Sequence, residues 1–260
     1  PVDAGTIAPY REAEDGQILQ EGICETGAMA SFMAAGTAYA NHGLPMIPFY
    51  IFYSIFGLQR VGDMIWGCGD MLCKGFLLGG TAGRTTLNGE GLQHEDGHSH
   101  VIASTVPNMR SYDPAFGYEL AVIIRDGIER MYQNNEEIFY YITVYNENYV
   151  MPAMPDGCED NIIKGMYRFS QSATTANDGR KAHLFGSGSI MNEVRRAAEI
   201  LEGMNISTDI WSVTSYNELT RDGIAIERTN RLQNKDDQCY VQELLAGEDG
   251  VFVAASDYMK

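Results

Sequence analysis

Histidines and carboxylates are concentrated in one glycine-rich stretch, residues 83–100, which reads GRTTLNGEGLQHEDGHSH. This stretch holds three of the chain's five histidines, with acidic side chains between them: His94, His98, His100, Glu90, Glu95 and Asp96. Its glycines let the backbone turn and allow a ligand to approach closely. A solvated loop has no need of so many titratable groups, so the stretch is a candidate site for proton transfer or ligand binding. The alternative is a polar surface loop whose histidines are incidental.

Residues 94–98 also match the H-E-x-x-H pattern of zinc peptidases. That chemistry needs a helix, which places both imidazoles on one face with the glutamate as the base. Gly97 lies inside the motif, Gly89 and Gly91 precede it, and no apolar helical repeat flanks it. Because a helix resists several glycines, a zinc metallopeptidase is only a remote alternative, and we predict no metal ligands here.

The elements that must position this stretch follow the pattern of an α/β protein. Short apolar runs predict strands at residues 49–53, 76–78, 101–104 and 138–144, the first of them buried, and helical spacing predicts helices at 17–41, 58–74 and 115–132. Alternating strands and helices indicate a parallel sheet with crossover helices. The histidine-rich stretch leaves the end of the strand at 76–78, where ligands collect in open sheets of this kind.

A second α/β unit is expected beyond residues 151–160, which contain two prolines and several turn residues. Its predicted elements are an edge strand at 166–169, strands at 181–185, 206–213 and 251–256, and a helix at 190–204. We therefore predict one domain over residues 1–155 and the start of another over 156–260. The Gly-Ser turn at 186–189 would suit a phosphate, but the dinucleotide fingerprint is incomplete, so an ordinary strand–turn–helix is favoured.

Composition limits the classes of function. The chain has 260 residues, a hydrophobic content of 45% and a net charge of −17. The first two values are typical of a globular protein, and the acidity argues against nucleic acid or an anionic membrane as the main partner. Five cysteines, an odd number, favour a reducing cytoplasm, and we predict a cytoplasmic protein.

One acidic side chain, Glu25, stands among apolar and small residues of the predicted helix at 17–41. It could be a first-turn carboxylate that the helix dipole stabilises. Alternatively, it could be a functional carboxyl in an apolar setting, where desolvation favours the protonated form.

Four segments resemble the family of homodimeric, bacterial-type E1 components of pyruvate dehydrogenase complexes: LNGEGLQHEDGHSH, QEGICETGAMASFMAAGTAYA, LPMIPFYIFYSIFGLQRVGD and TVYNENYVMPAMPDG. Several long motifs in the right order, along nearly the whole chain, make this resemblance specific. It covers the pyrimidine-binding middle domain and the first part of the C-terminal domain. The implied fold is a parallel-sheet, transketolase-like thiamin diphosphate-binding domain, followed by the start of a second α/β domain.

The resemblance implies an enzyme that oxidatively decarboxylates pyruvate with thiamin diphosphate and passes the acetyl group reductively to the lipoyl domain of the E2 acetyltransferase. Glu25 matches the carboxyl, of raised pKa, that meets the aminopyrimidine N1′ of the cofactor. Phe56 matches the aromatic residue that stacks on the aminopyrimidine. Tyr53 and His94 match the groups that face the substrate carboxylate and the adduct, and Glu90 matches a carboxylate that positions His94.

The family's metal-binding G-D-G motif does not occur in the sequence, since Arg125-Asp126-Gly127 lacks the first glycine. The resemblance places the Mg²⁺ ligands in an N-terminal domain outside this chain, which the other subunit of a homodimer supplies. We therefore expect this polypeptide alone to be inactive and to contribute half of an active site. His98 and His100 would support His94 or serve the structure.

Three other functions stay open. One is the E1 component of a different 2-oxo acid dehydrogenase, and another is a further transketolase-like enzyme. An enzyme for ketose phosphates is less favoured, because the cleft region is acidic rather than basic. The third is a non-catalytic assembly domain that has kept the fold.

Overall fold

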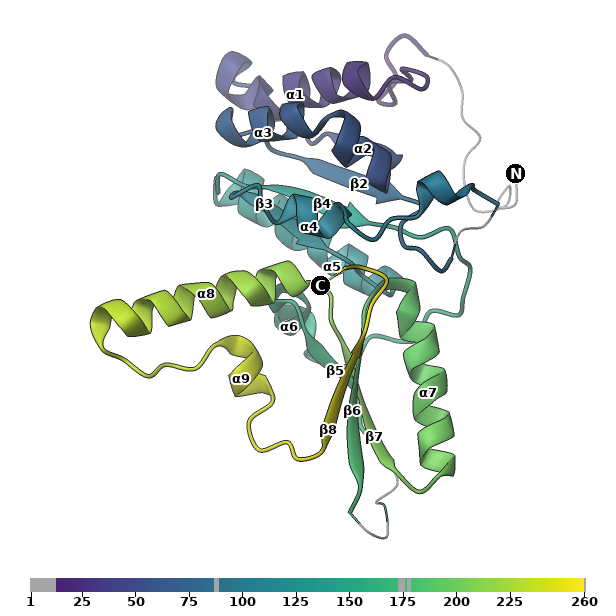
Figure 1. The fold of residues 1–260 in the computed structure, drawn as a ribbon. Helices are drawn as coiled ribbons and strands as arrows, with labels where there is room; N and C mark the ends of the chain where they lie inside the picture. The colour runs from purple at the N-terminus through teal and green to yellow at the C-terminus, as the bar shows by residue number, and fades with distance from the viewer. Residues whose placement is uncertain (1–12, 87–88, 173–175, 177–178, 260) are drawn as a thin grey trace.

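The computed structural model describes residues 13–86, 89–172, 176 and 179–259, and these form two four-stranded sheets (Figure 1). The first sheet has the spatial order β1 (Phe49–Tyr53), β2 (Phe76–Gly80), β4 (Phe139–Thr143) and β3 (Met109–Tyr112). All its neighbouring strands are parallel, which confirms the predicted sheet type. Its helical elements are α1 (Glu25–His42), α2 (Ser54–Arg60), α3 (Gly62–Asp70), the 3-10 turn Leu92–His94, α4 (Ser99–Ala103), α5 (Gly117–Ile128), the π-helical turn Glu129–Gln133 and α6 (Glu159–Lys164).

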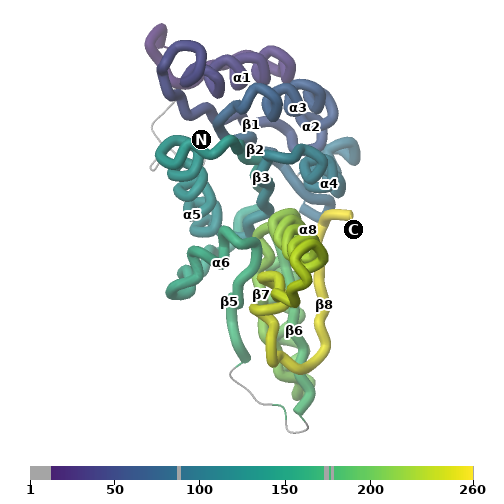
Figure 2. Tube along the Cα trace, turned by 90° about the vertical axis from the view of Figure 1, so that its left-hand side faces the viewer, coloured from purple at the N-terminus to yellow at the C-terminus, as the bar shows by residue number. Residues whose placement is uncertain are grey.

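Helices cover both faces of the first sheet, with α2, α3 and α4 on one side and α5 on the other (Figures 1 and 2). Strand β4 lies inside the sheet, and all five of its residues are buried. Its run of aromatic and β-branched residues fits this position, because both faces of a central parallel strand meet helices. The predicted strands at 49–53, 76–78 and 138–144 are thus confirmed.

Two predicted elements of this region are wrong. Residues 101–104 do not form a strand, since helix α4 already begins at Ser99. The Asp96 carboxylate accepts hydrogen bonds from the backbone N–H groups of His98 (3.1 Å) and Ser99 (2.9 Å), which stabilises the start of that helix. The strand that the sequence analysis missed is β3, Met109–Tyr112.

Two helix boundaries and the position of one strand also differ from prediction. The helix expected at 17–41 begins only at Glu25, and the one expected at 58–74 is divided into α2 and α3 at Val61. Strand β1 is an edge strand rather than a buried one, and Ile51 at its centre is 69% exposed. An edge strand covered on one side leaves alternate apolar residues at the surface.

The second sheet has the order β5 (Tyr167–Ser170), β7 (Ser207–Ser212), β6 (Lys181–Gly186) and β8 (Val251–Ala255). Strand β5 is an antiparallel edge strand, and the other pairs are parallel. The 3-10 turn Gly188–Ile190 and α7 (Met191–Gly203) follow β6, as the sequence predicts. Helix α7 covers one face, and α8 (Tyr216–Gln233) with α9 (Tyr240–Leu244), which the sequence analysis did not predict, covers the other (Figure 1).

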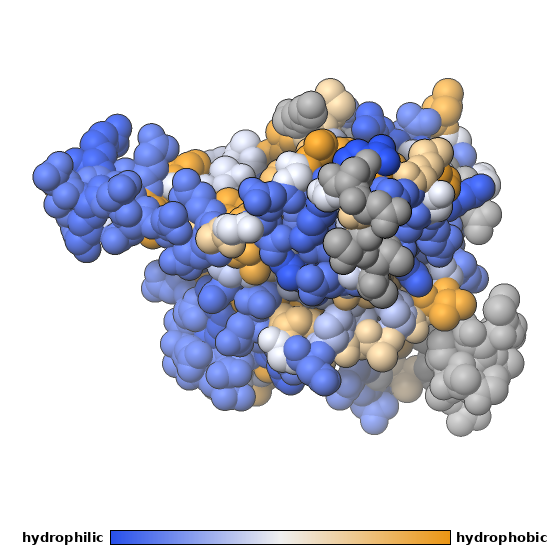
Figure 3. Space-filling model, turned by 90° about the horizontal axis from the view of Figure 1, so that it is seen from below, coloured by the Kyte–Doolittle hydropathy of each residue, from blue (hydrophilic) through white to orange (hydrophobic). Residues whose placement is uncertain are grey.

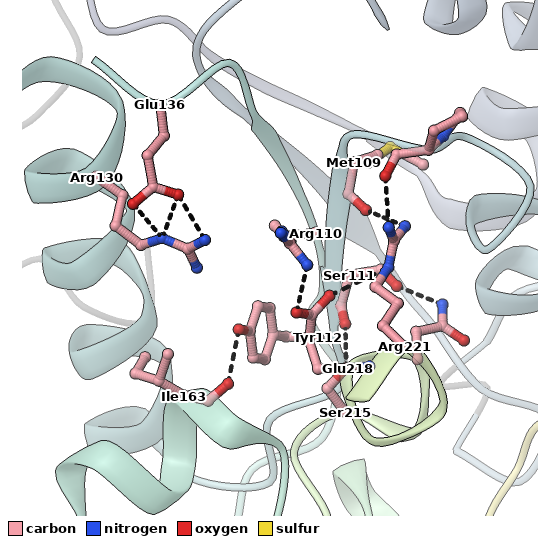
Figure 4. Close-up of polar contacts among 12 residues, drawn as sticks. Met109, Arg110, Ser111, Tyr112, Arg130, Glu136, Ile163, Ser215, Glu218 and Arg221 are labelled. Carbon is pink, nitrogen blue, oxygen red and sulfur yellow. Dashed lines mark hydrogen bonds and ion pairs between the residues drawn. The ribbon is translucent and has the colours of Figure 1, made fainter. Parts of the chain in front are cut away.

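Side chains of α8 join the two sheets (Figure 4). Arg110 of β3 forms a 2.8 Å ion pair with Glu218, and Ser215 Oγ donates to the Ser111 carbonyl at 2.6 Å. Arg221 donates to the carbonyl oxygens of Val106 (3.0 Å) and Met109 (2.9 Å). The buried Ile162 of α6 also belongs to the core of the first sheet, so the predicted division at residues 155/156 stays a prediction.

The face below the second sheet is largely hydrophilic (Figure 3), in keeping with the net charge of −17. Among the helices that the structure describes, none has both the length and the apolar content needed to cross a membrane.

Candidate active site

Three aromatic side chains meet at the carboxyl end of edge strand β1. Tyr53 is the last residue of β1, Phe56 lies in the first turn of α2, and His94 ends the 3-10 turn of the histidine-rich stretch. The His94 ring contacts the rings of Tyr53 and Phe56 edge to face, with centroid distances of 4.6 and 4.9 Å. The structure therefore brings together three of the residues singled out in the sequence.

An arginine that the sequence analysis missed connects Glu25 to this cluster. The Glu25 carboxylate forms an ion pair with Arg60 at the end of α2, and the Arg60 guanidinium lies 4.7 Å from the centroid of the Phe56 ring. Arg60 follows Phe56 by four residues, one helical turn, so the helical spacing was the available signal.

The expected raised pKa of Glu25 is wrong for this chain. Glu25 is the first residue of α1, where a hydrogen bond from the backbone lowers the pKa of its carboxyl, and Arg60 lowers it further. Burial acts in the opposite direction but is incomplete, since the side chain remains 18% exposed. The alternative of a first-turn carboxylate on a helix dipole thus describes its present setting.

The predicted pairing of Glu90 with His94 stays a prediction. Asn146 Nδ2 donates to Glu90 Oε1 at 3.2 Å. Within the described ranges, the other oxygen of Glu90 and the Nδ1 atom of His94 are buried without a hydrogen-bond partner. Buried polar atoms are normally satisfied by protein, water or a ligand, so these two atoms lack the partner that such atoms usually have.

Two known domain families match this chain, one after the other along its length. Residues 1–152 match the family model described as the pyruvate dehydrogenase E1 component middle domain. The chain belongs to the pyruvate dehydrogenase E1 family. Residues 165–260 match a second model, the transketolase-like C-terminal domain.

Curated members of the E1 family match this chain over its whole length. The pyruvate dehydrogenase E1 component of Pseudomonas aeruginosa is 58% identical over 263 residues, and that of Escherichia coli K12 is 53% identical over 264 residues. The match covers 100% of this chain but only 30% and 29% of those relatives. This chain therefore spans less than a third of the length of the curated relatives it matches.

Solved transketolases share the fold of this E1-family chain. The enzyme of Leishmania mexicana gives a TM-score of 0.65 at 15% identity, covering 92% of this chain and 30% of that one. The enzyme of Campylobacter jejuni gives 0.62 at 17% identity, covering 86% and 30%. A split gene transketolase, described as an inactive beta4 tetramer, gives 0.57 at 16% identity, covering 92% and 73%.

The histidine-rich stretch of this E1-family chain is not the helix that a zinc peptidase needs. The 3-10 turn ends at His94, and Glu95 has φ −59° and ψ 113°, outside the helical region. His98 is exposed, whereas His100 is partly buried and its Nε2 lies 3.0 Å from Thr143 Oγ1. The two imidazoles of the motif thus lack the common helical face on which that chemistry depends.

A cluster in the second domain contains side chains of the types that bind metals, but cationic side chains already lie against its carboxylates. Potential ligand atoms of His183, Asp209 and Glu248 lie within 4.8 Å of one another. The Lys181 ammonium lies 3.0 Å from Asp209 and 2.9 Å from Glu248, and Trp211 Nε1 donates to His183 Nδ1 at 3.2 Å. Lys181 and Arg168, which also pairs with both carboxylates, thus supply the positive charge that these groups need, and the cluster is an ion-pair network.

Proposed function

We propose that this chain is part of the E1 component of a pyruvate dehydrogenase complex. The complete enzyme would oxidatively decarboxylate pyruvate with thiamin diphosphate and reductively acetylate the lipoyl group of the E2 acetyltransferase. One observation carries this proposal: Glu25, Phe56, Tyr53 and His94 gather at the end of β1 in a chain that is 53–58% identical to E1 components along its whole length.

The residues present fit the aminopyrimidine half of thiamin diphosphate. Glu25 offers a carboxyl oxygen to a ring nitrogen, and Phe56 offers a partly exposed aromatic face. The cofactor, when bound, supplies the electron sink for decarboxylation. Glu25 would then hold a proton at the aminopyrimidine N1′, a role that needs a raised pKa. Since the backbone hydrogen bond, Arg60 and water now favour its charged form, the pKa should rise only when the carboxyl is covered.

His94 and Tyr53 would act on the substrate side of the site. A Tyr hydroxyl and an imidazole N–H can donate hydrogen bonds to the carboxylate of pyruvate, and a histidine can also move protons near neutral pH. The buried Nδ1 of His94, which has no partner within the described ranges, is free to take part. Glu90 would help to orient this imidazole.

An open apolar face beside the site favours completion by another subunit. Ile51 and Leu92 are 69% and 80% exposed, and Phe49 and Tyr53 are each nearly half exposed. We propose a homodimer with the active site at its interface, and Mg²⁺ ligands in the part of the E1 relatives that this chain does not span. The chain alone would be inactive, as the split gene transketolase is described to be in its beta4 tetramer. All five cysteines are free, which suits a cytoplasmic protein.

Glu25→Gln in the full-length enzyme tests the proposal. Because Gln cannot transfer the proton, we expect kcat with pyruvate, thiamin diphosphate and Mg²⁺ to fall by about 10²–10⁴-fold. Asp63→Asn is the matched control, since Asp63 is an exposed acid in the first turn of α3, and it should leave kcat unchanged. Unchanged turnover of Glu25→Gln would support a non-catalytic domain instead, and faster turnover of 2-oxoglutarate than of pyruvate would point to a different 2-oxo acid dehydrogenase.

A further inference from the structure

We propose that the second domain positions His94 through the segment that follows β8, residues Ser256–Met259, which we call the C-terminal strap. The inference rests on the proposed function, in which His94 faces the substrate. It assigns to Asp257 and Thr85 the task of holding the histidine-rich stretch in its working place. Figures 1 and 2 show the C-terminal end beside α4, at the end of that stretch.

Asp257 fixes the beginning of the stretch. The residue is only 3% exposed, and its two carboxylate oxygens lie 3.0 and 2.9 Å from Thr85 Oγ1, which shares its single proton between them. Gly83 makes the close approach possible, because its φ is +87° and a Cβ there would lie 2.5 Å from Asp257 Oδ2. A hydrogen bond to a buried carboxylate is stronger than one between neutral groups, so this contact is a firm anchor.

Two further contacts fix the other end of the stretch. The Met259 backbone N–H donates to the Gly97 carbonyl at 2.8 Å. Asn217 Nδ2, on α8, donates to the His100 carbonyl at 2.9 Å. Residues of the second domain thus hold the stretch at positions 85, 97 and 100, on both sides of His94.

The side chain of His100 extends this anchoring into the first sheet. Thr143 Oγ1 donates its single proton to Asp113 Oδ1 at 2.7 Å, so it accepts from His100 Nε2 at 3.0 Å. The backbone of Asp113 is bonded in turn to the second domain, through Thr214 O (2.7 Å) and Gly188 N (3.1 Å). The Tyr258 ring of the strap packs edge to face on His100, with a centroid distance of 4.6 Å.

His94 itself has few fixed contacts. Its backbone N–H bonds locally to the Gly91 carbonyl, and its ring has the edge contacts with Tyr53 and Phe56. The glycines at 89 and 91 give the segment before it little stiffness of its own. Its position therefore depends on where the two ends of the stretch are held, and small displacements of a catalytic group are costly in rate.

The test is Thr85→Val compared with Thr85→Ser in the full-length enzyme. Valine has the size of threonine but lacks the hydroxyl, whereas serine keeps it. For Thr85→Val we expect amide hydrogen exchange of residues 89–99 to become faster, and kcat with pyruvate to fall about tenfold to a hundredfold. The Kd for thiamin diphosphate should stay unchanged, because Glu25 and Phe56 lie outside the stretch. Thr85→Ser should keep wild-type values in all three measurements.

Asp257→Asn tests the same contact from the side of the strap, because the amide has only one acceptor oxygen for the Thr85 hydroxyl and carries no charge. The proposal is overturned if Thr85→Val and Thr85→Ser agree in exchange and in kcat, or if Thr85→Val weakens cofactor binding as much as it lowers kcat. Failure of the proposed function would look different. The wild-type enzyme would then not decarboxylate pyruvate, while the exchange measurement would still decide whether the strap holds the stretch.

Discussion

The candidate site and the junction between the two sheets each contain a glutamate at the start of a helix, but the surroundings of the two carboxylates are opposite. Glu25, at the start of α1, has a backbone hydrogen bond and one side-chain partner, the half-exposed Arg60, and is itself partly exposed. Glu119, in the first turn of α5, is fully buried and accepts four hydrogen bonds. Its donors are the backbone N–H groups of Ala115 (2.5 Å) and Phe116 (3.0 Å) and the hydroxyls of Tyr167 (2.7 Å) and Ser212 (2.6 Å).

The pKa values of the two carboxyls move in opposite directions. Burial raises the pKa of Glu119, and its four hydrogen bonds oppose the rise. The backbone hydrogen bond and Arg60 lower the pKa of Glu25, and burial opposes the fall. Burial alone therefore does not distinguish the carboxyl of the candidate site from a structural one in this molecule.

Two histidines, His183 and His94, differ in burial and in hydrogen bonding in the same way. His183, in the second sheet, is fully buried, its Nδ1 accepts from Trp211, and its Nε2 lies 3.2 Å from the Asp249 carbonyl. His94 is partly exposed, and its Nδ1 lacks a partner in the part of the chain that the structure describes. The fold thus satisfies the imidazole of His183 on both sides, whereas it leaves one nitrogen of the His94 imidazole without a partner among the described residues.

The largest stability effect expected from this contrast is that of Glu119→Ala. Four buried donors lose their acceptor at about 1 kcal/mol or more each, so the free energy of unfolding should fall by about 4 kcal/mol. Urea denaturation of this chain measures it. The control is Glu129→Ala, an exposed glutamate just beyond the same helix, which should change the value by less than about 0.5 kcal/mol. If both substitutions lower the free energy of unfolding equally, the buried, fully hydrogen-bonded carboxyl of Glu119 contributes no more to stability than the exposed carboxyl of Glu129.

A smaller loss is expected for Lys181→Met in the second sheet. Asp209 and Glu248 would then keep only the Arg168 guanidinium as a cationic partner, and since Lys181 is 26% exposed we expect a loss of about 2 kcal/mol. Lys235→Met, at an exposed lysine whose partner Asp237 is exposed too, should be nearly neutral. If Lys181→Met is as stable as the wild type, the cluster is not held together by this cation.

The smallest effect is the pH dependence of stability, which should have opposite signs for the two glutamates. The pKa of Glu25 is lowered from 4.5, so its contribution is present above pH 4.5 and is lost as the pH falls below it. The pKa of Glu119 is raised from 4.5, so folding disfavours its ionised form and stability falls as the pH rises above 4.5. Subtracting the unfolding free energies of Glu25→Gln and Glu119→Gln from wild-type values at each pH isolates the two slopes. Slopes of the same sign would contradict the comparison.

The sequence by itself determined the central strands of the first sheet and their parallel arrangement. The run at 138–144 is apolar enough to be a strand covered on both faces, and β4 occupies that position. The sequence also pointed to Glu25, Phe56 and His94, through motifs that lie far apart along the chain. Strand β3 escaped prediction because Met109–Tyr112 is short and half polar, and its burial comes from β4 and α8 rather than from its own pattern.

Only the tertiary structure decided which of these groups meet. Forty-one positions separate Tyr53 from His94, and 172 separate Thr85 from Asp257, yet both pairs are in contact. The periodicity of a segment records which of its own faces is buried, whereas the partner of a side chain depends on how distant elements pack. The sequence also suggested a raised pKa for Glu25, but the backbone hydrogen bond at the start of α1 lowers it, and Arg60, which is 35 positions away in the chain, lowers it further.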